Sequence, residues 1–196
     1  MNLYTRETGR MTLAGGRDVH IRLLRPGERS AVRQLFARLG PQTRYRRFLA
    51  PTAVLTESLL RTLTDVDGLW RLALVAELDE CDSGDVVGLG NVVSGEDDRS
   101  EVGLVVADAW QRRGIGSALA VRLLRAAEAR GHDRFVVHEH SDNPALRPLL
   151  RRVGEIVSTD IRSGFSEIAF VRRRSAEDRA YERILAAKGG LLDNRD

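Results

Sequence analysis

Apolar positions recur along this chain with two different periods, and the two periods alternate from one segment to the next. Segments in which every second position is apolar, or which form a short continuous apolar run, predict β-strands. These are 18–24, 70–78, 86–93, 101–106, 134–140, 155–161 and 165–172. Segments with apolar positions three and four apart predict amphipathic helices. These are 26–39, 42–49, 56–63, 115–130, 143–153 and 175–188.

Cap and turn signals separate these segments and indicate one domain. Thr56 is an N-cap signal for its helix, and Ser163-Gly164 joins the last two strands as a hairpin. A chain of 196 residues is long enough for one domain with a full core and short for two. We therefore predict a flexible arm at 1–16, one α/β (α+β) domain at 17–174, and a helix and tail at 175–196. The domain should hold a mixed, mostly antiparallel sheet flanked by helices.

A strand, a glycine turn and a long amphipathic helix follow one another between Glu101 and Arg130. Gly114 and Gly116 bring backbone N–H groups together at the start of that helix. The first N–H groups of a helix have no partner within it and its dipole is positive there, so such a turn is suited to phosphate. A Walker loop would need a lysine that is absent here, and Leu119 stands where a dinucleotide fingerprint has a third small residue. Both of those motifs are disfavoured.

The turn resembles motif A of the GCN5-related N-acetyltransferases (GNAT), Q/R-x-x-G-x-G/A. This chain carries it as Gln111-Arg112-Arg113-Gly114-Ile115-Gly116. The resemblance covers the order of elements from Arg17 to Arg173, and it implies acetyl-CoA as cosubstrate. The early stretch RYRRFLAP, followed by LTESLLRTLTDVDG, is similar to the acetyltransferase domain of bacterial protein lysine acetyltransferases. The implied acceptor is a primary amine, either a protein lysine or a small molecule.

The same resemblance implies roles for single residues. Glu101 matches the position whose carboxylate acts as general base, often through water. Backbone groups of a bulged strand are expected to meet the pantetheine arm, and Asn143 matches an asparagine near that arm where two strands splay. Cofactor binding is thus expected at Leu104, Val105, Val106, Gln111, Arg112, Arg113, Gly114, Ile115, Gly116, Ser117, Ala118 and Asn143. By spacing alone, Glu101 could equally be a solvated strand-end carboxylate, and Asn143 could be a helix cap.

Family members commonly carry a tyrosine seven positions after the asparagine, to return a proton to the thiolate. This chain has Leu150 there, so water would have to serve. His138 and His140 share a strand face and could chelate a metal, but no third ligand is evident and we expect no metal.

The acceptor side is expected at the early helices, where the resemblance places Tyr45, Arg46, Arg47 and Phe48. Helix packing with solvated arginines is the alternative for these four residues. If they are functional, the arginines favour an acceptor with acidic surroundings.

Composition narrows the classes of protein to which the chain could belong. The formal net charge is +3, and every basic residue except Lys188 is an arginine. The basic residues are scattered among acids with no aromatic platform, which makes a nucleic-acid surface unlikely. No apolar run approaches the length of a membrane span and the first ten residues are polar, so we expect a cytoplasmic protein. Cys81 is the only cysteine, which rules out a disulfide within the chain.

The hypothesis from the sequence is an acetyl-CoA-dependent N-acetyltransferase that works by direct attack of the amine, with a carboxylate general base. A non-catalytic acyl-CoA-binding regulatory module is the alternative, and a basic nucleic-acid-binding protein is a weaker one. A homodimer, the acyl-chain preference and regulation by ligands stay open.

Overall fold

The computed structural model describes residues 8–52, 54–79, 84–95, 97–140 and 143–173. Its elements in chain order are β1 (Gly9–Thr12), β2 (Asp18–Leu23), α1 (Arg29–Ala37), α2 (Pro41–Phe48), α3 (Glu57–Thr64), β3 (Arg71–Leu78), β4 (Val86–Ser94), β5 (Ser100–Val106), a short 3-10 helix (Asp108–Trp110), α4 (Ile115–Glu128), β6 (Phe135–His140), α5 (Leu146–Val153), β7 (Gly154–Arg162) and β8 (Phe165–Arg172). None of the helices within these ranges is long and apolar enough to cross a membrane.

The strands form one sheet in the order β1-β2-β3-β4-β5-β6-β8-β7. Neighbouring strands are antiparallel except β5 and β6, which are parallel and pair only at Ser100 with Phe135 and at Glu101 with Val136. Beyond Glu101 the two strands diverge, while β5 stays paired with β4 as far as Val106. The sheet is therefore mixed and mostly antiparallel, as predicted, and it is open between β5 and β6.

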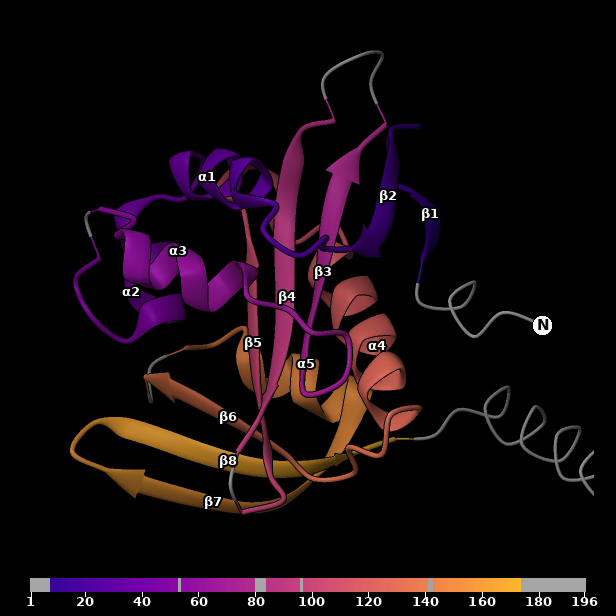
Figure 1. Ribbon diagram of the computed structural model, residues 1–196. Helices are drawn as coiled ribbons and strands as arrows, with labels where there is room; N and C mark the ends of the chain where they lie inside the picture. The colour runs from indigo at the N-terminus through magenta and orange to yellow at the C-terminus, as the bar shows by residue number, and fades with distance from the viewer. Residues whose placement is uncertain (1–7, 53, 80–83, 96, 141–142, 174–196) are drawn as a thin grey trace, which may run out of the picture.

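Helices cover both faces of this sheet, with α1, α2 and α3 on one side and α4 on the other (Figure 1). The side chains of β4 point alternately to these two faces. A Cβ on Gly88 would meet Leu119 and Ile115 of α4, whereas Asn91 accepts a hydrogen bond from Arg47 of α2. Successive strand side chains point to opposite faces, so α2 and α4 lie on opposite sides of the opening between β5 and β6.

Local signals in the sequence explain several element ends. The Oγ1 of Thr56 accepts a hydrogen bond from the Leu59 N–H at 3.2 Å, which confirms the predicted cap of α3. Ser163 and Gly164 both have positive φ, at 51° and 85°, and they form the tight turn of the predicted hairpin between β7 and β8. Gly131, with φ of 93°, follows the last turn of α4.

The structure differs from the sequence-based expectation at three places. Residues 9–12 form β1, paired with β2, where an arm outside the domain was predicted. An edge strand can be held by backbone hydrogen bonds alone, so its sequence shows no clear periodicity. The helix α1 begins at Arg29 instead of Pro26, because Gly27 has φ of 73°, and α5 begins at Leu146 instead of Asn143. The predicted helix at 175–188 and Cys81 lie outside the described residues.

Candidate active site

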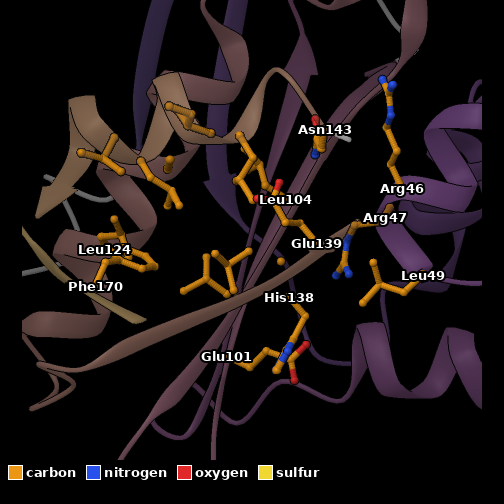
Figure 2. A pocket seen from close by; sticks show the side chains of 18 residues that line it. Arg46, Arg47, Leu49, Glu101, Leu104, Leu124, His138, Glu139, Asn143 and Phe170 are labelled. Carbon is orange, nitrogen blue, oxygen red and sulfur yellow. The ribbon is translucent and has the colours of Figure 1, made fainter. Parts of the chain in front are cut away.

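Two pockets meet at the opening between β5 and β6. The first, which we call the inner pocket, is drawn in Figure 2 and contains Glu101 on its β5 side and His138 on its β6 side. The second, which we call the turn groove, follows the backbone of 104–106 to the glycine turn at 111–117. Five residues line both pockets and so mark their junction: Arg46, Arg47, Leu104, Asn143 and Leu149.

The glycine turn presents backbone N–H groups to the turn groove. Gly114 has φ of 89° and forms the N-cap of α4, a conformation that favours glycine. The first hydrogen bond of the helix runs from the Ala118 N–H to the Gly114 carbonyl at 2.9 Å. The N–H groups of Ile115, Gly116 and Ser117 precede that bond and have no partner within the helix. These three N–H groups lie at the positive end of the helix dipole, a position that favours an anion, and we refer to them as the anion cradle.

The predicted residues of the turn contribute in different ways. Ala118 uses its N–H inside the helix, and Ile115 has its side chain in the core at 1% exposure, so only its backbone can meet a ligand. Gly116 lies near Leu104 and Val106. A Cβ added to it would be 3.5 Å and 3.7 Å from their methyl groups, which is ordinary contact. Such a Cβ is tolerated by the protein and would occupy space in the groove.

Three arginine side chains lie around the turn. Arg112 lines the turn groove, whereas the Arg113 guanidinium lies over the Trp110 ring, 5.0 Å from its centroid. Arg152 of α5 donates a hydrogen bond to the Ser117 Oγ at 3.4 Å and thus stands beside the helix start. Sequence reasoning missed Arg152, because nothing in its spacing connects α5 to the turn.

A hydrogen-bond network ties the turn to the start of α2. Gln111 donates from Nε2 to the Val106 carbonyl at 3.0 Å and to the Thr43 Oγ1 at 3.1 Å. Asp108 accepts from the Gly40 N–H and from the Thr43 Oγ1, both at 2.7 Å. The Gln111 side chain is therefore a brace within the protein. Thr43 and Asp108 were not selected from the sequence because their partners are far away along the chain.

The free edge of β5 borders the junction of the two pockets. A bulge was expected at 104–106, but the register with β4 runs without a shift to the pair of Gly88 with Val106. The expectation of a bulge in this ladder is wrong. Beyond Glu101 the divergence of β6 leaves the opposite edge of β5 without a partner among the described strands, so Leu104, Val105 and Val106 can still offer backbone groups there.

Asn143 lies at the junction, where the resemblance placed it. Its Oδ1 accepts a hydrogen bond from the Ala145 N–H at 3.2 Å. The side chain thus stabilises the turn before α5, although the N-cap of that helix is Ala145. Leu150, in the place of the family tyrosine, is 4% exposed and lines the inner pocket, so the pocket wall is apolar at that point.

Glu101 is exposed and lies on the same face of β5 as Gly103, toward α2. Arg47 of α2 reaches this face. Its Nη2 donates to the Asn91 Oδ1 at 2.5 Å, and a Cβ on Gly103 would lie 2.6 Å from the guanidinium carbon. Only glycine at 103 leaves room for this guanidinium. Burial lowers the pKa of the Arg47 guanidinium from its ordinary value, and the nearby negative charge of Glu101 opposes that shift.

The other predicted members of the acceptor wall do not reach the pockets. Tyr45 stacks on His140 with ring centroids 4.2 Å apart, and Phe48 packs against Phe36 with centroids 6.0 Å apart. Neither residue lines the inner pocket or the turn groove. Of the four residues at 45–48, the two arginines carry the contact with the site.

The β6 residues of the site point to opposite faces of the strand. Glu139 is 2% exposed and lines the inner pocket, with the Arg147 Nε 3.8 Å from its Oε1. The His138 Nδ1 lies 3.9 Å from the Glu167 Oε2. His140 is buried against Tyr45 and at 4.6 Å from the Phe165 ring. Across the described ranges, no three His, Cys, Asp or Glu side chains form a group that could hold a metal ion.

Comparison with known proteins places this geometry in a family. The sequence model of the acetyltransferase (GNAT) family matches residues 42–154. An acetyltransferase of Pseudomonas aeruginosa is 31% identical over 150 residues, which are 76% of this chain and 81% of that protein. The GNAT domain of S. lividans PAT shares the fold with a TM-score of 0.76 at 20% identity, over 87% of this chain and 99% of that one.

A further solved structure is that of yncA from Salmonella typhimurium with its cofactor acetyl-CoA. It shares the fold with a TM-score of 0.57 at 18% identity, over 81% of this chain and 96% of that one. The family resemblance carried by the glycine turn is thereby confirmed. The chain belongs to the acetyltransferase (GNAT) family and is an N-acetyltransferase.

Proposed function

We propose that the enzyme moves an acetyl group from acetyl-CoA to a primary amine by direct attack, with Glu101 as general base. The observation that carries this proposal is the junction of the two pockets. The anion cradle lies at the far end of the turn groove, and a carboxylate lies in the inner pocket on the other side of the junction. A thioester held at the junction would be open to an amine that enters from the inner pocket.

Acetyl-CoA fits the turn groove by the chemistry of the donors present. Its pyrophosphate would accept from the N–H groups of Ile115, Gly116 and Ser117, with Arg152 and Arg112 adding positive charge. Its pantetheine amides would pair with the free edge of β5 and with Asn143. The structure of yncA with acetyl-CoA supports the choice of cosubstrate. The proposal needs no metal ion, and a cytoplasmic location is part of it.

The amine has to lose a proton before it can attack. An amine with a pKa of about 10.4 is neutral in roughly one molecule per two thousand at pH 7. Glu101 is the carboxylate that meets solvent and lines the inner pocket, so it can accept this proton directly or through water. The amine nitrogen then bonds to the carbonyl carbon, the carbon–sulfur bond breaks, and coenzyme A leaves as a thiolate. The nitrogen loses its second proton as the amide forms. Leu150 offers no proton, so this second proton passes through water to the thiolate.

The test of this function is coenzyme A release with a panel of primary amines and lysine-bearing peptides, with acetylated product identified by mass spectrometry. We expect stoichiometric release and acetylation for at least one acceptor class, and a rise of melting temperature with acetyl-CoA alone. A rise of melting temperature with no release for any amine would contradict transfer and favour a non-catalytic acyl-CoA-binding module.

A further inference from the structure

The fold holds Arg47 at the junction without a direct ion pair to a described residue. The guanidinium is fixed between the Gly103 backbone and the Phe48 ring, whose centroid is 5.4 Å from Cζ. Its Nη2 donates to a neutral amide, that of Asn91. Its Nε is inaccessible to solvent and has no hydrogen-bond partner among the described residues. A guanidinium has five N–H donors, so most of the donor capacity of Arg47 is available to another group.

Among the described residues, the charge of Arg47 has no partner in direct contact, although the negative charge of Glu101 lies near enough to act on it. Among the residues that the structure describes, no carboxylate lies within 4.0 Å of this guanidinium, Glu101 included. A partly desolvated cation is costly unless an anion pairs with it. The neighbouring Arg44 also donates to a neutral group, the Phe36 carbonyl at 3.1 Å, and lies 4.2 Å from the Phe36 ring centroid. What distinguishes Arg47 is its place, because it lines both pockets and Arg44 lines neither. Arg47 therefore has unused N–H donors at the pocket junction, where an anionic group of a ligand could pair with it.

Glu101 lies beside Arg47 in the same pocket, and the two charges are opposite. Gly103, under the guanidinium, is two positions from Glu101 on the same face of β5, which places their Cα atoms about 7 Å apart. A ligand between them would present a cation to Glu101 and an anion to Arg47. A zwitterion with its two charged groups on one carbon atom matches this pattern.

We infer that the acceptor of this enzyme is an α-amino acid, whose carboxylate is bound by Arg47 while its amine lies near Glu101. Arg47 is then a specificity-determining residue. The apolar wall of the pocket, formed by Leu146, Leu149, Leu150 and Val153 of α5, suits an apolar side chain on that amino acid. This inference rests on the proposed function, because it names the substrate class of the same site.

The inference separates the two acceptor classes that the sequence left open. The ammonium of a protein lysine is at the end of a flexible stem with no carboxylate beside it. Binding it would bury Arg47 further without an anion. Sites that offer a hydrogen-bonding group reject analogues that lack the partner group, so a lysine peptide should be a poor acceptor.

The test compares three acceptors that share an amine and an isobutyl side chain: L-leucine, its amide leucinamide, and isopentylamine, which lacks the carboxylate. Coenzyme A release is measured under saturating acetyl-CoA for each, and a lysine-bearing peptide is added as the fourth acceptor. We expect kcat/KM for L-leucine to exceed that for the amide and the amine by about 10- to 100-fold. Equal values for all three, or a preference for the peptide, would overturn the inference.

Variants of Arg47 connect this preference to the residue. Arg47→Gln should reduce kcat/KM for L-leucine by about 10-fold or more and leave the amine nearly unaffected, so that the preference disappears. Arg47→Lys should retain part of it, because the charge remains without the planar fork. Arg61→Gln on α3, an exposed arginine that lines neither pocket, is the matched control and should keep the wild-type preference. Equal losses on all three acceptors in Arg47→Gln would show a structural role and would contradict the inference.

A binding measurement makes the result independent of turnover. Titration calorimetry of N-acetyl-L-leucine, in the presence of coenzyme A, should show binding to the wild type and to Arg61→Gln, and about 10-fold weaker binding to Arg47→Gln. Binding of equal strength to all three proteins would overturn the role of Arg47. If acetyl-CoA itself fails to raise the melting temperature, the proposed function fails, whereas the carboxylate site is still judged by this titration.

Discussion

A methyl group added at Gly103 tests the placement of Arg47 without changing a charge. In Gly103→Ala the new Cβ would lie 2.6 Å from the Arg47 Cζ and 2.7 Å from the Asn91 Oδ1. Both distances are far below van der Waals contact, so the guanidinium has to move and its hydrogen bond to Asn91 at 2.5 Å has to break. The side chain is flexible and the β5 backbone keeps its register, so the domain should still fold.

The size of the effect follows from these contacts. Loss of a hydrogen bond to a charged group costs about 1.5 to 3 kcal/mol, and rehydration of the displaced guanidinium offsets part of it. The free energy of unfolding should therefore fall by about 1 to 2 kcal/mol. Gly103 lines only the inner pocket, whereas the displaced Arg47 lines both pockets. We therefore expect kcat/KM for a carboxylate-bearing acceptor to fall about 10-fold and acetyl-CoA affinity to fall less.

The assay combines urea unfolding with acceptor kinetics at saturating acetyl-CoA. Gly9→Ala is the matched control, since a Cβ on that strand glycine would meet only the Arg122 Nη2 at 3.6 Å. It should change neither stability nor kinetics by much. If Gly103→Ala matches the wild type in both measurements, the guanidinium does not lie over Gly103 in solution, and the reasoning about Arg47 is refuted.

Three further predictions concern other parts of the molecule. Gly116→Glu should abolish the rise of melting temperature with acetyl-CoA, because its carboxylate repels the pyrophosphate; a full rise in a folded variant would place the phosphate site elsewhere. Asp108→Ala removes the hydrogen bond that Asp108 accepts from the Gly40 N–H. The free energy of unfolding should fall by about 1 kcal/mol and the KM for acetyl-CoA should increase, and unchanged values for both would contradict a role of this network in holding the turn. The hydrogen bond from Arg22 lowers the pKa of Glu28 below 4.5, so the ionised Glu28 stabilises the fold above that pH. In urea unfolding, the stability deficit of Glu28→Gln should therefore shrink as the pH falls through the lowered pKa, and a constant deficit would refute this coupling.

Much of this fold is predictable from local sequence. The strands of the sheet, the helix after the glycine turn and the hairpin at Ser163-Gly164 are specified by periodicity and turn chemistry, and the structure confirms them. The strand β1 could not be predicted in the same way. It is held at the sheet edge by pairing with β2, and its burial alternates only between half-buried and exposed.

The site was predictable where its residues are consecutive and less so where the fold brings distant segments together. The cradle at Gly114 and Gly116 follows from the sequence of the turn. The contact of Arg47 with Asn91 and Gly103 joins α2 to β4 and β5, and no spacing along the chain indicates it. Helical spacing likewise could not show that Tyr45 stacks on His140 and is thereby held outside both pockets.

The role of Glu101 as general base is tested by the pH dependence of kcat/KM for the acceptor in Glu101→Gln, at saturating acetyl-CoA. Glutamine keeps the size of the side chain and removes the proton acceptor. We predict a loss of about 10²-fold at pH 7, with acetyl-CoA affinity unchanged, and a deficit that shrinks as the pH rises toward the amine pKa. A variant within about twofold of the wild type at every pH would show that Glu101 is not the base, and Glu139 in the same pocket would become the next candidate.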